Sequence, residues 1–269
     1  MAVDHYENFP VASILLPRAL REPVAAIYVF ARSADDFADE DSRSPEERLA
    51  LLEDYRTELD AIEANRPSQH PVFLRLRPVI SDYGLPLQPF RDLLDAFSQD
   101  VVKTRYETFT ELLDYCRRSA DPVGRLLLRL FRSDSEENRH RSDAICSALQ
   151  LINHWQDIGI DATKPVSRIY LPTEDLAHFG VAEETILRRV ATADFRALMR
   201  FQVDRARALM VEGAPLGSVL PGRIGLEIRA IVASGLRILE KIEAVGYDVF
   251  ERRPVLQMFD WPRVMLKAL

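Results

Sequence analysis

Apolar residues recur at intervals of three and four positions along most of this chain, and strict alternation of apolar and polar residues is almost absent. Such intervals match the turn of an α-helix, whereas a half-buried strand repeats every two residues. The pattern predicts an all-α protein. A start signal supports this at Ser44, where an N-cap serine is followed by Pro45 and Glu47 as a capping box. The stripe from Leu49 to Ile62 then predicts a helix of about 20 residues.

Capping residues also indicate where two further helices start. Thr108 and Glu111 repeat the capping box, so a helix is expected directly after Thr108. Asp121 precedes Pro122, which predicts an N-cap aspartate and a first-turn proline for the next helix.

Two long helices complete the pattern. The segment 142–160 is apolar around much of its circumference, as expected of a helix in the middle of a bundle. Another helix is predicted over 223–245 and is ended by Gly246. The longest irregular stretch is expected at 162–172. Because no linker, composition shift or repeat divides the chain, residues 1–269 are expected to form one helical domain.

Composition narrows the function classes. The net charge of −7, from 35 basic and 42 acidic residues, has the wrong sign for a protein that binds nucleic acid. Cys116 and Cys146 match no zinc or redox spacing, so they are expected to be free thiols in a reducing cytoplasm. Neither a signal peptide nor an apolar membrane span is found, and a peripheral membrane contact remains open.

Asp35 and Asp39 are four residues apart and follow the apolar run 24–30. On a helix this spacing places both carboxylates on one face. Because like charges at this spacing repel, the arrangement makes most sense with a cation between them. A solvated acidic helix end is the alternative for this motif taken alone.

A second set of oxygen donors consists of Asn153, Asp157 and Asp161, again four residues apart, with Gln150 one turn earlier on nearly the same face. An amide and two carboxylates are hard ligands of the kind that hold Mg²⁺ together with waters and phosphate oxygens. A satisfied polar network is the alternative. Two such helices facing each other in a bundle would clamp a Mg²⁺–diphosphate from two sides.

The chain resembles the squalene/phytoene synthase family of head-to-head prenyl-transferring enzymes. The resemblance covers nearly the whole chain and includes both Asp-rich motifs, 26–32, Tyr115-Cys116, Val123-Gly124, 168–172 and Gly246-Tyr247-Asp248. It implies the isoprenoid synthase fold with a central diphosphate-binding cavity, and Mg²⁺-dependent chemistry on an isoprenoid diphosphate. It also implies that the metal-binding and catalytic residues are Asp35, Asp39, Asn153, Asp157 and Asp161.

Substrate contacts are implied as well. The expected set is Ser13, Tyr28, Arg32, Tyr115, Gln150, Arg168, Tyr170 and Tyr247. Arg32, one turn before Asp35, is the first choice for a cation on the diphosphate. Aromatic faces stabilise a carbocation, and the candidates are Tyr28, Phe30, Tyr115, Trp155 and Tyr247. Packing in the core is the alternative for each aromatic residue.

Within the family, residues 8–17 and 153–157 look most like the hopanoid-pathway branch called hydroxysqualene synthase, which turns presqualene diphosphate into hydroxysqualene with water. The residue before the second-motif aspartate is commonly Arg in the family, and here it is Gln156. Loss of a diphosphate-facing cation would disfavour joining two farnesyl diphosphates. The alternatives are a presqualene diphosphate, squalene or phytoene synthase and, less favoured, a non-enzymatic assembly factor.

The C-terminal segment allows two interpretations. Its apolar residues are Leu256, Met258, Phe259, Trp261, Val264, Met265 and Leu266. They form either a surface that contacts a membrane, into which an apolar product is released, or a helix docked on the core. Contact with other enzymes of the same pathway also remains open.

Overall fold

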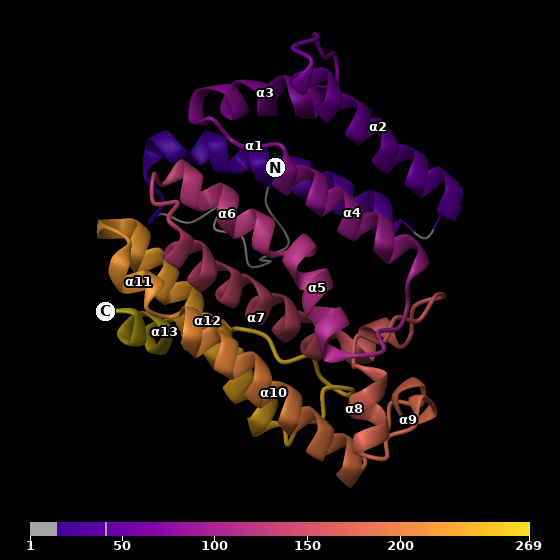
Figure 1. Cartoon of the computed structure of the whole chain (residues 1–269). Coiled ribbons are helices and arrows are strands. Elements are labelled where there is room, and N and C mark those ends of the chain that lie inside the picture. Colours follow the sequence, from indigo (N-terminus) through magenta and orange to yellow (C-terminus); the bar gives the residue numbers. More distant parts are fainter. Residues whose placement is uncertain (1–14, 41) are drawn as a thin grey trace.

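The helical periodicity of the sequence is realised throughout the computed structural model, which describes residues 15–40 and 42–269 (Figure 1). The long helices are α1 (Arg18–Asp39), α2 (Pro45–Glu63), α3 (Pro71–Tyr83), α4 (Gln88–Val102), α5 (Phe109–Ser119), α6 (Asp121–Leu130), α7 (Glu136–Asp161), α10 (Ala193–Gly213) and α12 (Gly222–Ala244). The shorter ones are α8 (Thr173–His178), α9 (Glu183–Leu187), α11 (Leu216–Val219), the 3₁₀ helix η2 (Met258–Asp260) and α13 (Trp261–Ala268). Within these ranges the β-type pairing is one isolated bridge between Arg105 and Ile169. The all-α prediction is confirmed.

The capping signals are confirmed in part. At the start of α2, Ser44 Oγ accepts from the backbone N–H of Glu47 at 3.3 Å, and the Glu47 carboxylate accepts from the N–H of Ser44 at 2.8 Å. At α5, Thr108 Oγ1 accepts from the N–H of Glu111 at 3.1 Å. The Glu111 carboxylate, however, accepts from the N–H of Glu107, so the second capping box is only half formed.

The predicted N-cap role of Asp121 is wrong. Ala120 occupies the cap of α6, and Asp121 is the first residue of the helix. Its buried carboxyl group accepts a hydrogen bond from Ser147 Oγ on α7 at 2.9 Å. A polar group removed from water needs such a partner, and here the partner ties α6 to α7.

The end of α12 confirms the prediction at Gly246. Gly246 has a φ of 62°, which glycine adopts without a steric penalty. Its N–H donates to the carbonyl of Glu243, and the N–H of Tyr247 donates to the carbonyl of Ile242. This pair of bonds is the Schellman motif. The irregular stretch 162–172 also lies where it was expected, between α7 and α8.

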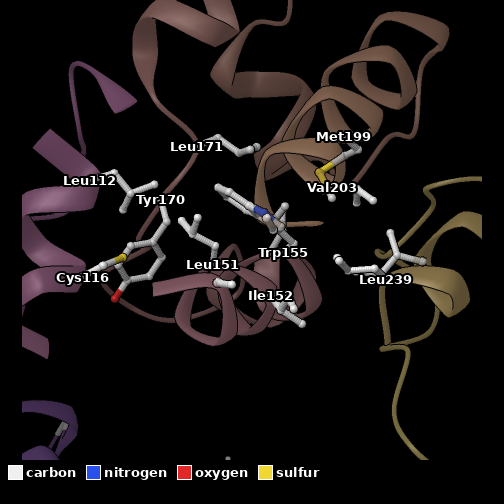
Figure 2. Packing of buried hydrophobic residues seen from close by; sticks show 14 of the residues in the cluster. Leu112, Cys116, Leu151, Ile152, Trp155, Tyr170, Leu171, Met199, Val203 and Leu239 are labelled. Carbon is white, nitrogen blue, oxygen red and sulfur yellow. The ribbon is translucent and has the colours of Figure 1, made fainter. Parts of the chain in front are cut away.

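Helix α7 lies between α5 and α6 on one side and α10 and α12 on the other (Figure 1). This explains why it is apolar around so much of its surface. Trp155 is fully buried, and Figure 2 shows its indole beside Leu171, Met199 and Val203. Trp155 is therefore a core residue. Helix α10 approaches α7 closely at Gly213, where a Cβ atom would lie 2.6 Å from the carbonyl oxygen of Arg141.

A second apolar cluster joins α1 to α2, α3 and α4. Phe30 is at its centre, with ring centroids of Tyr55, Phe73 and Phe90 at 5.5, 5.7 and 5.2 Å. Phe30, like Trp155, does not line the cavity described below, so the prediction that these two rings face a carbocation is not supported. Burying both rings fixes α1 and α7, the two helices that carry the predicted donors.

The C-terminal segment returns along α12, against which α13 packs. Val264 and Ala268 are buried in this contact, as expected of a docked helix, whereas Met258, Phe259 and Leu266 are exposed. No helix in the described ranges is long and apolar enough to cross a bilayer.

Candidate active site

A cavity of about 300 Å³ lies between α1, α4, α5 and α7, and three residues of the segment 162–172 also line it. Helix α1 contributes Asp35 and Asp39, and α7 contributes Asn153, Asp157 and Asp161. The spacing of four along each helix is what places these side chains on a common face. The structure thus brings all five predicted metal-binding residues to one cavity.

The α1 carboxylates are paired with arginines. Arg32 contacts Asp35 at 3.3 Å and Asp36 at 2.9 Å, one turn along the same helix. Arg168 reaches across from the segment after α7 and donates to Asp39 Oδ1 at 2.8 Å. The pKa of Arg168 is raised, because nearby Tyr170 and Asp39 outweigh the opposing effect of burial. Arg168 therefore carries a permanent positive charge in the cavity.

The α7 carboxylates are paired as well. Arg253, in the segment between α12 and α13, donates from Nε and Nη2 to the two oxygens of Asp157. Lys164 Nζ lies 3.0 Å from Asp161 Oδ1. Burial raises the pKa of Asp161, and the neighbouring Lys164 opposes this shift. Each of the four carboxylates thus has a cationic partner.

Gln156 does not face the cavity. Its side chain is buried, and Nε2 donates to the carbonyl oxygen of Pro254 at 2.5 Å. A residue at this position points about 100° away from Asp157 around the helix axis. The interpretation that Gln156 marks the loss of a diphosphate-facing cation is therefore not supported. The cation beside Asp157 comes from Arg253, and no local pattern around residue 253 predicts this contact.

A polar cluster forms another wall. Tyr115 OH donates to Asp100 Oδ2 at 2.7 Å, and Tyr170 OH donates to Asp100 Oδ1 at 3.4 Å. Burial raises the pKa of Asp100 to about 7, although both phenols and Arg168 oppose this shift. The cluster places a titratable carboxyl and two phenol rings at the cavity.

His154 stacks on Tyr170 with ring centroids 3.6 Å apart. Burial lowers the pKa of His154 to about 3, with smaller contributions from Arg168 and Lys164, so its ring is neutral at neutral pH. Its buried Nε2 has no hydrogen-bond partner among the described residues. This agrees with a packed histidine beside the second motif.

The structure brings most predicted substrate-binding residues together. The cavity is lined by Tyr28, Arg32, Tyr115, Gln150, Arg168 and Tyr170. Tyr247 is not among the lining residues: it follows the end of α12, where its ring lies 5.5 Å from the Arg200 guanidinium. The prediction for Tyr247 is therefore not supported. Ser13 lies outside the described residues.

Asp100 and Lys164 also line the cavity and were missed. A signal for Asp100 existed, because a lone carboxylate there interrupts the apolar stripe of Leu93, Phe97 and Val101. Lys164 had no such signal, since it lies in an irregular segment.

The donor set fits Mg²⁺ bound together with a diphosphate. Among the described residues, no group of three or more His, Cys, Asp or Glu side chains is gathered closely enough to hold a metal ion by itself. The donors instead form two sets of hard oxygens on two helices of one cavity. Mg²⁺ is commonly bound by one or two carboxylates plus waters and substrate phosphates, which matches this divided arrangement.

The all-helical fold matches solved structures of squalene and dehydrosqualene synthases, and it defines the chain as an isoprenoid synthase. The sequence pattern of the family described as squalene/phytoene synthase matches residues 2–260, and the chain belongs to this family of head-to-head prenyl diphosphate synthases.

Relatives from two branches are similar to the chain. A hydroxysqualene synthase from Rhodopseudomonas palustris is 36% identical over 239 residues, covering 88% of this chain and 80% of its own. A 15-cis-phytoene synthase from Synechococcus elongatus is 30% identical, with coverages of 97% and 89%. Among solved structures, squalene synthase HpnC from Alicyclobacillus acidocaldarius is 40% identical with a TM-score of 0.83, over 91% of this chain and 90% of that one.

Proposed function

We propose that this protein converts presqualene diphosphate to hydroxysqualene, with release of diphosphate and capture of water. The observation that carries the proposal is one cavity with two oxygen-donor sets, in a chain whose hydroxysqualene synthase relatives share 33–36% identity. The phytoene synthase relatives share 29–31%.

The diphosphate end of the substrate would lie between α1 and α7. The residues that would hold Mg²⁺ there are Asp35, Asp39, Asn153, Asp157 and Asp161. The ion supplies stabilisation of the negative charge that develops on the departing diphosphate. Arg32, Lys164 and Arg168 line the same cavity and can donate directly to phosphate oxygens. Since each is paired with a carboxylate, binding of metal and diphosphate would exchange these partners.

The hydrocarbon end needs an apolar, water-poor space. The cavity is also lined by Phe97, Val123 and Leu149, and a smaller apolar cavity shares Val123 and Leu149 with it. Such walls exclude water from a carbocation until its rearrangement is complete. The rings of Tyr115 and Tyr170 face the same space and can stabilise the positive charge.

Asp100 is proposed to accept the proton when water is captured. The water oxygen forms a bond to the rearranged carbocation, and the proton it loses passes to a carboxylate oxygen of Asp100. Asp100 is the buried carboxyl at the phenol wall of the cavity, and its raised pKa, about 7, suits a base that works near neutral pH. The hydroxyls of Tyr115 and Tyr170 hold the carboxylate in place.

A direct test supplies presqualene diphosphate with Mg²⁺ and, separately, farnesyl diphosphate with Mg²⁺, and measures the mass of the extracted lipids. An alcohol of squalene carbon number is expected from presqualene diphosphate alone, and Asp157→Ala is the inactive control. Consumption of farnesyl diphosphate would instead support condensation of two prenyl diphosphates. That second candidate is favoured by the phytoene synthase relatives, which align with 93–100% of this chain.

We also propose that the protein works in a reducing compartment such as the cytoplasm. Cys116 is buried, Cys146 is partly buried, and both are free thiols. Burial raises the pKa of both thiols, so neither is a reactive thiolate at neutral pH.

A further inference from the structure

Large apolar side chains are unusually exposed at the C-terminal end. The four with the highest exposed fractions among the described residues are Met258 at 89%, Leu269 at 85%, Leu266 at 76% and Phe259 at 69%. All four lie within the last twelve residues of the chain. We call them the C-terminal apolar surface. A surface helix of a water-surrounded protein normally turns polar residues outward, so this concentration calls for a partner.

Helix α13 has apolar residues on opposite sides, one side buried and the other exposed. Val264 and Ala268 are one turn apart on the face that packs on α12, and both are buried. Leu266 is two positions from each of them, about 200° around the helix axis, and is exposed. The inner face of the helix is therefore apolar, whereas its outer face carries the exposed Leu266 between Arg263 and Lys267. Core packing accounts only for the inner one.

The charges beside this surface are mostly positive. Four basic and two acidic side chains form one connected cluster: Arg237, Lys241, Arg263, Lys267, Glu240 and Asp260. Two positive charges are thus in excess, in a chain whose net charge is −7. Lys241 Nζ also lies 5.2 Å from the centre of the Phe259 ring, so the basic cluster and the apolar surface are continuous.

We propose that the C-terminal apolar surface docks this protein on the face of an anionic phospholipid bilayer. Apolar side chains enter the boundary between headgroups and acyl chains, while adjacent lysine and arginine side chains contact the lipid phosphates. A second copy of the chain fits less well, because two clusters with the same positive excess repel each other. The docking does not depend on which prenyl substrate the cavity accepts.

The chain supplies its own reporter for this docking. It has two tryptophans, of which Trp155 is fully buried, whereas Trp261 begins α13 and is partly exposed. Trp261 should therefore carry any change in fluorescence caused by lipid. With vesicles of phosphatidylcholine that contain phosphatidylglycerol, we expect the emission to shift to shorter wavelength and to be quenched by lipids brominated on their acyl chains. A Trp261→Phe variant should lose the signal while still sedimenting with the vesicles.

Sedimentation of the full chain with vesicles provides the quantitative test. Phe259→Ser and Leu266→Ser should each weaken binding about tenfold, because each removes one inserted apolar side chain. Lys267→Gln should weaken binding about fivefold, and only to vesicles that contain phosphatidylglycerol. Val102→Ser is the matched control, since Val102 is 67% exposed on α4, away from the C-terminal apolar surface.

Three outcomes would overturn the proposal. The first is no sedimentation with either anionic or pure phosphatidylcholine vesicles. The second is binding that Phe259→Ser and Leu266→Ser leave unchanged. The third is a concentration-dependent dimer that the same two substitutions abolish while vesicles fail to bind, which would identify a second copy as the partner. The substitutions lie on exposed positions, so circular dichroism should show an unchanged fold in each variant.

Discussion

Arg253 donates hydrogen bonds to both carboxylate oxygens of Asp157, a residue 96 positions earlier in the chain. The same oxygens are the proposed ligands of Mg²⁺. An arginine and a metal ion would therefore compete for one carboxylate, and metal binding would favour Arg253 turned away or moved to a phosphate oxygen of the substrate.

Arg253→Gln should tighten the binding of Mg²⁺ alone. The ion pair is partly exposed, with 38% of the Arg253 side chain and 28% of the Asp157 side chain accessible. Pairs of this kind contribute roughly 0.2–1 kcal/mol, so an affinity increase of about 1.4- to fivefold is expected. Titration calorimetry without substrate measures it. Arg252→Gln, at the exposed neighbouring position, is the control, and equal affinities in all three proteins would contradict the competition.

Asp100→Asn should slow formation of the alcohol by about 100-fold, within the range that a positioned base contributes. An unprotonated Asp100 is required, so the wild-type rate should rise with pH through about 7, and the variant should lack this rise. Binding of Mg²⁺ with inorganic diphosphate should be unchanged, because Asp100 does not belong to the donor set. Asp92→Asn, on the same helix and away from the cavity, is the control. An unaltered pH profile in Asp100→Asn would rule out the assigned role.

Asp121→Asn should flatten the pH dependence of stability. Burial, together with nearby Asp143, raises the pKa of Asp121 to about 8, from an ordinary value of 3.8. The folded chain thus retains a proton that the unfolded chain releases. The resulting stabilisation is fully present below about pH 4 and is lost as pH rises toward 8. Asparagine keeps an acceptor for Ser147 and does not ionise.

Between pH 5 and 8 the free energy of unfolding of the wild type should therefore fall relative to Asp121→Asn, by up to about 1.4 kcal/mol per pH unit. Denaturant titrations at several pH values measure the difference. Parallel curves for the two proteins would show that Asp121 is already ionised in the folded chain.

Gly213→Ala should destabilise the fold. The added methyl group would lie 2.6 Å from the Arg141 carbonyl oxygen, so α10 would have to move away from α7. Overpacking of this kind costs about 1–3 kcal/mol and should lower the thermal midpoint by several degrees. Val211→Ala on the exposed face of α10 should change the midpoint little. A midpoint equal to the wild type would mean that the two helices separate without penalty.

Periodicity and capping signals predicted the all-α class and helices such as α2, α5, α7 and α12, because these signals are local. The capping box at Ser44 and the Schellman ending at Gly246 depend on neighbouring residues, and both are confirmed. Asp121 shows the limit of such reasoning. Its buried carboxyl group is bonded to a hydroxyl on another helix, a contact that the neighbouring residues do not reveal.

In the candidate site, too, local spacing predicted some features and could not predict others. The spacing of four correctly grouped the donors on α1 and on α7, and the cavity that joins them is observed. Local spacing could not predict the contacts of Gln156 and Arg253. Each contact joins α7 to a segment almost 100 residues later in the chain that folds back on it. For Phe30 and Trp155, composition could not distinguish a ring in the core from a ring at the cavity, since both surroundings are apolar.

The return of the C-terminal segment to α7 has a practical consequence for purification. Pro254 accepts a hydrogen bond from Gln156, and Arg253 donates to Asp157, so these two residues of the C-terminal segment are tied to the helix that carries the second donor set. An affinity tag fused after Leu269 would extend directly from the exposed apolar end. A preparation clipped near Glu251 would retain most of its mass while losing Arg253. The intact mass of each preparation should therefore be measured, because a protein concentration does not distinguish the full chain from one that has lost Arg253.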